Sequence, residues 1–267
     1  MTEFNLRLKA SVDANKFRYG YPWIYSNEII SDRRTKSLLP GSFCKLVDYN
    51  KNPICLVTVN PKSKIFARVM DFNFETTVDA YWLKDKISKA LAKRKEIFRD
   101  PFYRLVNAEA DELPGLIVDR FDNVIVMQPN AFWAENMSEI IANSIKEVCS
   151  IDVVIKNASG RSRRLEGLDD KNSVFFGDLP EAAISVPMNG AIYKADVHEG
   201  QKTGLFYDQR QNHKFVASLA NGKTVLDVFC HVGGFGLAAI AAGASKVSFV
   251  DSSANALDLV REGASEM

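Results

Sequence analysis

The segment that most restricts the fold of this chain lies near its carboxyl end, over residues 223–251. An apolar strand pattern ends at the acid Asp227, and a turn that contains Gly233 and Gly234 follows it. An alanine-rich helical stretch and a second strand pattern, which also ends at an acid, Asp251, complete the unit. Strand, turn, helix and strand in this order are typical of a parallel sheet covered by helices. We therefore predict an α/β unit of a doubly wound sheet.

The arrangement of the glycines limits the ligand that this unit can bind. A dinucleotide-binding turn requires G-x-G-x-x-G, whereas here two glycines are adjacent and a third follows after one residue. The phosphate-binding pattern G-x-x-x-x-G-K-[ST] is absent as well. Asp227 would repel a pyrophosphate, and Asp251 can accept hydrogen bonds from ribose hydroxyls. These features predict S-adenosylmethionine, which has no phosphate and carries a cationic centre. The alternative is a turn of a doubly wound sheet that binds no ligand.

The composition is that of an ordinary globular protein with enough apolar residues for a core. The chain has 267 residues, of which 46% are hydrophobic and 25% charged. No apolar run approaches the roughly 18 residues of a membrane span, and the first residues lack an apolar signal core. The four cysteines and three histidines show no zinc-binding spacing. We predict a cytoplasmic protein that binds no metal and no membrane; no pattern indicates its oligomeric state.

The first 72 residues have the pattern of a small β domain with a basic surface. Short alternating runs at 43–48, 54–60 and 65–70 are separated by turn sequences. Residues 1–100 carry 19 Lys and Arg against 11 Asp and Glu, whereas the remainder carries 15 against 22. An excess of basic residues in this part of the chain is typical of a surface that binds phosphates. The alternative is a solvated basic face without a partner.

Aromatic and basic residues are interleaved just before these strands, over residues 16–25. Aromatic rings can stack on nucleotides, and Lys and Arg can contact phosphates. We assign Trp23 to the core of the small barrel instead. The residues predicted to bind RNA are Arg18, Tyr21, Lys62, Lys64 and Arg68.

Residues 73–183 are predicted to form a connector helix followed by a compact α+β domain. Apolar residues recur at helical spacing over 77–100, where Pro101 ends the pattern, and again over 132–148. Two strand patterns flank Asp122-Asn123, which predicts a hairpin.

This region contains two clusters of charge. The acidic cluster of Glu109, Asp111 and Glu112 is either a solvated loop or a group that binds a cation or acts as acid and base. The second cluster is basic and either contacts phosphate or pairs with nearby acids; it comprises Arg161, Arg163 and Arg164.

The last third of the chain begins with its strongest hairpin signal, Asn189-Gly190 between two short apolar runs. A polar segment follows over residues 199–210, directly before the strand that ends at Asp227. Because this segment is too polar for a core, we predict that it forms a lid or wall of the pocket at the glycine turn.

Four segments together resemble one known family and occur in that family's order: Tyr21–Ser26, Tyr103–Phe121, Gln201–Arg210 and Val225–Phe235. The family comprises class I methyltransferases with an N-terminal PUA domain that act on cytosine C5 of large-subunit ribosomal RNA. The resemblance implies ribosomal RNA as the partner and three parts: a PUA RNA-binding domain over 1–72, a middle α+β domain over 73–183, and a β-hairpin with the start of the Rossmann-like domain over 184–267.

The resemblance also implies the residues of the site. Those expected to line the S-adenosylmethionine pocket are Asp227, Phe229, Gly233, Gly234, Phe235 and Asp251. Those expected to wall its methionine end or to position the target base are Lys202, Asp208 and Arg210.

Methyl transfer to cytosine C5 uses a thiolate that adds to C6 of the base. Cys230 lies in the cofactor turn, and in the family the catalytic cysteine comes much later, so we interpret Cys230 as a residue of the pocket floor. We expect the catalytic cysteine beyond residue 267 and expect this chain alone not to transfer methyl groups. The alternatives are a non-catalytic RNA-binding protein and a methyltransferase for another RNA base.

Overall fold

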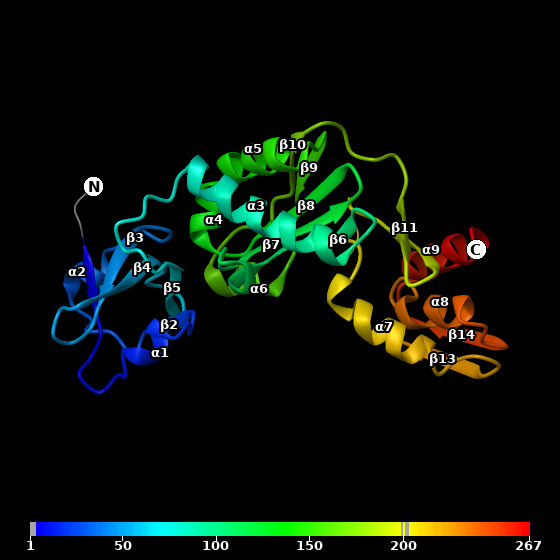
Figure 1. The fold of residues 1–267 in the computed structure, drawn as a ribbon, viewed down its shortest axis with the longest axis horizontal. Coiled ribbons are helices and arrows are strands. Elements are labelled where there is room, and N and C mark those ends of the chain that lie inside the picture. Colours follow the sequence, from blue (N-terminus) through cyan, green and yellow to red (C-terminus); the bar gives the residue numbers. More distant parts are fainter. Residues whose placement is uncertain (1–3, 199, 201–202) are drawn as a thin grey trace.

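The computed structural model describes residues 4–198, 200 and 203–267. Three lobes follow one another along the long axis of the molecule in the order of the sequence (Figure 1). We name them the first lobe (4–72), the middle lobe (73–183) and the third lobe (184–267). The carboxyl terminus lies at the end of the molecule opposite the first lobe (Figure 1). The mixed α/β architecture confirms the predicted fold class.

The first lobe is built on a five-stranded sheet in the order β1-β3-β4-β5-β2. β1 pairs with β3 in parallel, and the other neighbours are antiparallel. Apolar side chains such as Leu6, Phe17 and Leu46 are fully buried inside it. Its elements are β1 (Asn5–Arg7), α1 (Asn15–Arg18), β2 (Trp23–Tyr25), α2 (Arg33–Lys36), β3 (Phe43–Val47), β4 (Pro53–Val59) and β5 (Ile65–Asp71).

The middle lobe has a five-stranded sheet in the order β10-β9-β8-β7-β6, with α3 and α5 packed on one face (Figure 1). The predicted hairpin joins β7 and β8, and Asp122 adopts the left-handed conformation that this turn requires (φ 56°). The elements are α3 (Ala80–Ile97), β6 (Phe102–Asn107), η1 (Ala108–Asp111), β7 (Leu116–Phe121), β8 (Val124–Pro129), α4 (Phe132–Asn136), α5 (Ser138–Cys149), β9 (Val153–Lys156), α6 (Arg161–Glu166) and β10 (Ser173–Phe176).

The helix predicted over 132–148 is two helices, α4 and α5, because Met137 leaves helical geometry (φ −105°, ψ 14°). The periodicity continues across the break, since Trp133 and Ile141 both enter the middle-lobe core. A hydrophobic pattern reports the buried face and does not detect a break of one residue.

The third lobe joins a two-stranded hairpin to a two-stranded parallel sheet with helices. Asn189 and Gly190 both have positive φ (55° and 79°), which is the predicted hairpin turn. Strand β12 of the hairpin packs against α8 and α9. The elements are β11 (Ile184–Met188), β12 (Ala191–Ala195), η2 (Tyr207–Gln209), α7 (Arg210–Ala217), β13 (Thr224–Val228), α8 (Gly234–Ala241), β14 (Lys246–Val250) and α9 (Ala254–Ser265).

A polar network connects the first and middle lobes. Trp23 Nε1 donates to Glu109 Oε1 (2.7 Å), and Arg68 Nη1 donates to the same oxygen (3.0 Å). Arg68 also pairs with Glu166, which accepts from Asn60 Nδ2. Because the Arg68 side chain is only 12% exposed and held by two carboxylates, the structure corrects its prediction as an RNA contact. Trp23, which we assigned to the barrel core, is only partly buried and is not in the first-lobe core cluster; it serves this junction instead.

The two other acids of the acidic cluster also form ion pairs with arginine or lysine. Asp111 is buried and pairs with Arg94, and Glu112 pairs with Lys86. Each carboxylate of the cluster therefore has a basic partner within the protein, which opposes the acid–base interpretation.

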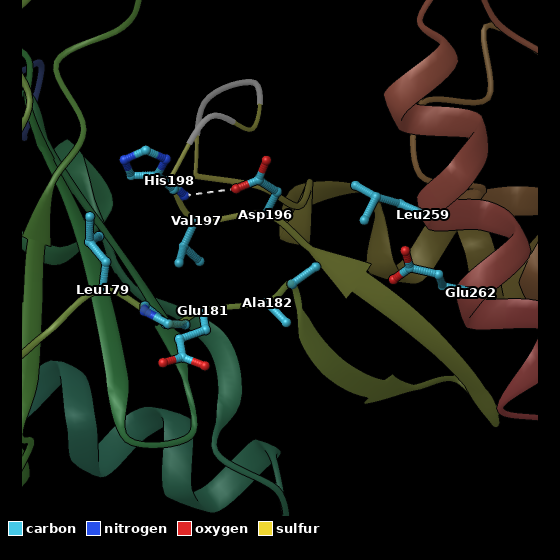
Figure 2. Close-up of a pocket in the computed structure, with 10 residues that line it drawn as sticks. Leu179, Glu181, Ala182, Asp196, Val197, His198, Leu259 and Glu262 are labelled. Atoms are coloured by element: carbon cyan, nitrogen blue, oxygen red, sulfur yellow. Dashed lines mark hydrogen bonds between the residues drawn. The ribbon is translucent and has the colours of Figure 1, made fainter.

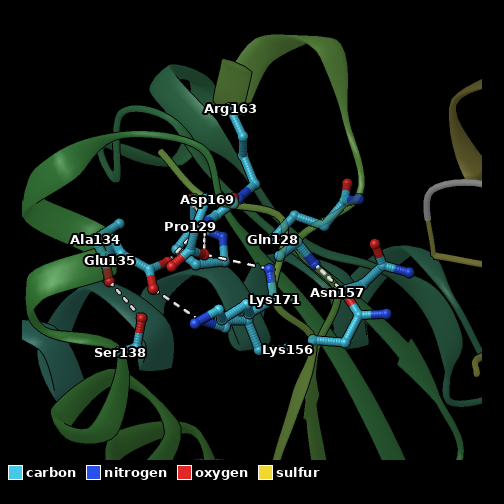
Figure 3. A network of polar contacts seen from close by, with 12 residues as sticks. Gln128, Pro129, Ala134, Glu135, Ser138, Lys156, Asn157, Arg163, Asp169 and Lys171 are labelled. Carbon is cyan, nitrogen blue, oxygen red and sulfur yellow. Dashed lines mark hydrogen bonds and ion pairs between the residues drawn. The ribbon is translucent and has the colours of Figure 1, made fainter. Parts of the chain in front are cut away.

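The basic cluster is partly structural. Figure 3 shows Arg163 among Pro129, Glu135 and Asp169. Its guanidinium is fully buried and donates to Glu135 Oε2 (2.7 Å) and to the carbonyl oxygen of Asp169 (2.9 Å). Of the two alternatives, Arg163 therefore pairs with acids, whereas Arg161 and Arg164 are exposed.

Candidate functional site

The buried carboxylate of Asp227 supports the glycine turn through a backbone hydrogen bond. Asp227 is 6% exposed and accepts a hydrogen bond from the backbone N–H of Gly236 (2.8 Å). Burial raises the pKa of Asp227, the Gly236 bond opposes this rise, and the nearby charge of Asp251 adds to it. Asp227 thus fixes the turn at the beginning of α8 and does not line the pocket described below.

The glycines of the turn make room for protein side chains. A Cβ on Gly234 would lie 2.5 Å from His213 Nε2, and one on Gly236 would lie 2.1 Å from the Phe249 ring. Gly233 has φ 79°, a conformation that favours glycine. Gly233 and Gly234 are not among the residues that line the pocket at the turn, and protein side chains lie beside them. That they let the backbone approach the ligand stays a prediction.

Asp251, the residue directly after β14, is hydrogen-bonded to the backbone of the turn. Asp251 accepts hydrogen bonds from the backbone N–H groups of Ser253 (2.9 Å) and His231 (2.8 Å). These bonds hold the pKa of Asp251 below its ordinary value, so the carboxylate is ionised at neutral pH. Phe229 and His231 have positive φ (59° and 50°), and non-glycine residues in this region are uncommon and often functional.

A pocket of about 500 Å³ opens beside this turn. Phe229 and Asp251 line it, and Phe229 is 88% exposed. Phe206 contributes a second ring, packed edge-to-face on His231 at 4.8 Å between centroids. Further lining residues are Asp196, Gly204, Val232, Ser252, Ser253 and Asn255; of these, Gly204 lies in the polar segment that was predicted to wall the pocket. An ionised carboxylate, exposed aromatic surface and this volume fit an adenosine-bearing, phosphate-free cofactor.

A second pocket of about 580 Å³ adjoins the first and shares Asp196 and Leu259 with it. Figure 2 shows its residues on three elements: the segment before β11, the segment after β12, and α9. The backbone N–H of His198 donates to Asp196 Oδ1 (2.9 Å). Among the described residues no group of three or more His, Cys, Asp or Glu side chains is placed to hold a metal ion.

The polar segment before α7 does border the pocket at the turn, as predicted, but only over part of its length. Gly204 and Phe206 line that pocket, whereas Asp208 and Arg210 line a separate depression against the middle lobe. That Asp208 and Arg210 wall the methionine end of the cofactor or position the target base stays a prediction. Lys202 lies outside the described residues.

The remaining predicted site residues are distributed as follows. Phe235 packs edge-to-face on the buried ring of His213 (4.6 Å) and so supports the turn. In the first lobe, Lys62 and Lys64 are exposed, and Tyr21 is 39% exposed. Arg18 pairs with Asp48 and keeps 37% of its side chain exposed. Four of the five predicted RNA-binding residues therefore remain accessible.

Cys230 is buried in the third lobe, and its Sγ donates weakly to the His231 carbonyl oxygen (3.6 Å). Burial, and then the charges of Asp227 and Asp251, raise the pKa of its thiol. A thiol of this kind is a poor nucleophile. Cys230 is not among the residues that line the pocket at the turn, and its interpretation as a residue of the pocket floor stays a prediction.

Comparison with known proteins defines the class. Residues 6–72 match the family described as PUA-like domain, and residues 163–265 match the family described as S-adenosylmethionine-dependent methyltransferase. One segment of the chain is therefore similar to PUA-like domains, and another is similar to a methyltransferase family that depends on S-adenosylmethionine. No helix within the described ranges is both long and apolar enough to cross a membrane.

Its relatives are ribosomal RNA methyltransferases by name. The chain is 34% identical to ribosomal RNA large subunit methyltransferase I of Shewanella frigidimarina over 245 residues, which cover 91% of this chain and 62% of the relative. It is 33% identical to ribosomal RNA large subunit methyltransferase of Deinococcus radiodurans over 265 residues, which cover 94% of this chain and 64% of the relative. The chain is thus homologous to these proteins and spans less than two thirds of their length.

The fold agrees with a solved structure. A protein of Streptococcus mutans, described as a candidate S-adenosylmethionine-dependent methyltransferase, superposes with a TM-score of 0.81 at 18% identity. The match covers 97% of this chain and 66% of that one. A second solved structure, described as a candidate methyltransferase complexed with SAH, superposes equally well. These similarities confirm the Rossmann-like assignment of the third lobe.

Proposed function

We propose that this chain belongs to an enzyme that methylates ribosomal RNA, with C5 of a cytosine as the acceptor. The observation that carries the proposal is the pocket at the glycine turn, where the ionised Asp251 lies beside the exposed ring of Phe229. In this proposal Asp251 accepts hydrogen bonds from the ribose hydroxyls of S-adenosylmethionine, and Phe229 offers a face to its adenine. The names of the relatives support RNA as the substrate.

Titration calorimetry with S-adenosylmethionine tests the pocket. Asp251→Asn keeps the size of the side chain and one acceptor oxygen but removes the charge, so we expect affinity to fall about tenfold, the value of one charge-assisted hydrogen bond. Asp258→Asn is the matched control because Asp258 lies on the exposed face of α9, where it pairs with Arg261. Equal affinities of the Asp251→Asn variant and the unmodified chain would assign the cofactor to another place.

The exposed basic side chains of the first lobe support RNA binding. Neutralising phosphates with Lys and Arg releases counterions, so affinity should fall steeply with salt concentration. We expect the combined change of Arg18, Lys62 and Lys64 to Ala to weaken RNA binding and to flatten the salt dependence by up to about three phosphate contacts. The control removes Lys223 and Lys246, which are exposed on the third lobe. An unchanged slope would mean that this face does not contact RNA.

The burial of the cysteines bears on whether this chain can methylate cytosine C5. Methyl transfer to C5 by addition of a thiolate to C6 needs an accessible cysteine with an ordinary or lowered pKa. All four cysteines are buried, and burial raises the pKa of each thiol, to about 11 for Cys44 and Cys149 and about 12 for Cys55. We therefore propose that these 267 residues bind cofactor and RNA but do not methylate cytosine C5 by themselves. Incubation with ribosomal RNA and methyl-labelled cofactor should leave the RNA unlabelled; appreciable label on cytosine would refute this part.

A further inference from the structure

A depression of about 230 Å³ lies where the middle and third lobes meet, and we call it the seam depression. The end of α3 and strand β6 supply one side with Phe98 and Asn107, and η2 with the start of α7 supplies the other with Asp208 and Arg210. Its volume is below the roughly 300–1,000 Å³ of pockets that hold drug-sized ligands, so it suits a group of about one nucleobase.

The aromatic and basic groups of the depression form a layered stack. The rings of Phe98 and Tyr103 lie parallel, with centroids 5.4 Å apart and an interplanar angle of 20°. The guanidinium of Arg210 lies over the Phe98 ring, 4.5 Å from its centroid. Arg210 Nη1 also donates to the Phe102 carbonyl oxygen (2.9 Å), which holds the guanidinium plane in place. A flat cationic plane held in this way is a surface on which bases of single-stranded RNA stack.

Arg210 differs from the two other arginines that line the depression. Arg94 pairs with Asp111, and Arg104 pairs with Asp119. In the part of the chain that the structure describes, Arg210 makes no ion pair with a carboxylate, although it is half-buried. Burial lowers its pKa from the ordinary value, which is the expected sign for a cation that is desolvated without a full counter-charge. The electron-rich face of an aromatic ring placed over the Arg210 guanidinium would stabilise this partly desolvated cation.

The segment that contains Phe206 and Arg210 lines both the seam depression and the pocket at the glycine turn. Phe206 lies in that pocket and Arg210 in the depression, so at most about 14 Å of chain separates them. The segment is anchored to the middle lobe, because Thr203 Oγ1 donates to Asp119 (2.6 Å) and Tyr207 Oη donates to the Arg120 carbonyl oxygen (2.9 Å). A group in the depression is therefore held within a few nucleotide lengths of the cofactor pocket.

We propose that the seam depression binds one unpaired RNA base that flanks the base to be methylated, stacked on the guanidinium of Arg210. Enzymes that modify a base take it out of the stack and contact its neighbours. Asn107 and Asp208 stand at the rim, where an amide and a carboxylate can bond to the edge of the stacked base. This inference rests on the proposed RNA methyltransferase function and adds to it a subsite for a flanking nucleotide.

The test compares Arg210→Lys with Arg99→Lys in the 267-residue chain, using fluorescence anisotropy of a labelled oligocytidylate. Both changes keep the charge, but only Arg210 lines the depression. We expect Arg210→Lys to weaken binding roughly tenfold, which is the size of one lost base stack, and to leave the salt slope unchanged. Binding of inorganic polyphosphate, which has no bases, should be the same in all three proteins. Circular dichroism establishes that the variants are folded.

The outcomes separate this subsite from the proposed function. If the unmodified chain binds the oligonucleotide and Arg210→Lys binds it equally well, the subsite is refuted while RNA binding stands. If the unmodified chain binds no RNA, both are refuted. A loss for polyphosphate that equals the loss for oligocytidylate would show a phosphate contact and overturn base stacking. Should Arg210→Lys fail to fold, Asn107→Ala, whose side chain is exposed, provides the same comparison with an expected threefold to tenfold loss.

Discussion

The sheets of the middle and third lobes are covered to very different degrees. In β8 of the middle lobe, Ile125 and Met127 pack under α3 and α5, while Val126 packs against the third-lobe hairpin, and all three are fully buried. In the parallel pair β13–β14, by contrast, Leu226 is 65%, Val228 45% and Val250 49% exposed. Parallel sheets are ordinarily covered on both faces. The middle lobe therefore depends on a complete core, whereas β13–β14 depends on one helical face and on the bonds within its turn.

The largest expected effect tests the middle lobe. Glu135→Ala removes a carboxylate that pairs with the fully buried Arg163 and with Lys156, and leaves a buried charge with only part of its counter-charge. We expect a loss of about 3–5 kcal/mol in the free energy of unfolding. Urea unfolding followed by tryptophan fluorescence measures it, because Trp82 and Trp133 lie in the middle-lobe core. Glu139→Ala on the exposed face of α5 is the control; an equal loss in both variants would contradict the special role of Glu135.

The next effect concerns acid sensitivity of the third lobe. His213 is 3% exposed, and burial lowers its pKa to about 4, although the charge of Asp208 opposes this. Because the folded-state pKa lies below the unfolded value of about 6.5, the stabilisation is complete above pH 6.5 and is lost as the pH falls toward 4. The full loss is about 3 kcal/mol.

Limited proteolysis at pH 7.5 and pH 5 measures this difference between the lobes. Cleavage in α7 and α8 should increase at pH 5 while the middle lobe stays intact. His213→Gln should reduce the pH dependence, whereas His198→Gln, at an exposed position, should keep it. Equal acid sensitivity of both lobes would contradict the prediction.

A smaller effect is expected at the helix of the glycine turn. Gly236→Ala would place a Cβ 2.1 Å from the Phe249 ring, so the ring or the helix must shift. We expect a loss of about 2 kcal/mol, typical of overpacking, in hydrogen exchange of the amides of α8 and β14. Gly160→Ala in the middle lobe is the control, because the nearest atom to its added Cβ is Ser162 Oγ at 3.7 Å. Unchanged exchange in α8 would show that this contact is easily relieved.

The smallest effect tests the exposed strand face directly. Leu226→Thr on β13 should change the free energy of unfolding by less than about 0.5 kcal/mol, as surface substitutions do. The same change at Leu116 in β7, which is fully buried, should cost about 3 kcal/mol or more through a cavity and a buried hydroxyl. Thermal unfolding of the pair measures the contrast. Similar losses in the two variants would mean that Leu226 is covered in solution.

Several parts of this architecture follow from local pattern. Strands β3, β4 and β5 of the first lobe, the hairpin at Asn189-Gly190 and the strand–turn–helix–strand unit were predictable because alternation and turn residues act over a few positions. The short strands β1 and β2 were not predicted. The break at Met137 was not, since the apolar face continues through it. The residues around the pocket at the glycine turn were predictable only in part: Asp251 and Phe229 were predicted individually and line it. Phe206 and His231 lie in predicted segments but were not singled out, and Asp196 comes from a segment without a distinctive pattern.

By itself the sequence determined the class of fold, the position of the glycine turn and an acid at the end of each strand beside it, because these are properties of short segments. Only the tertiary structure decided what each polar residue does. Arg68 and Arg163 resemble phosphate-binding residues in the sequence, yet carboxylates distant in the chain neutralise them. The turn glycines resemble ligand contacts, yet His213 and Phe249 fill the space beside them. Arg210 lies close to Phe206 in the chain, yet the two side chains line different depressions. Charge pairing and close packing depend on which distant segments meet, and a single sequence does not contain that information locally.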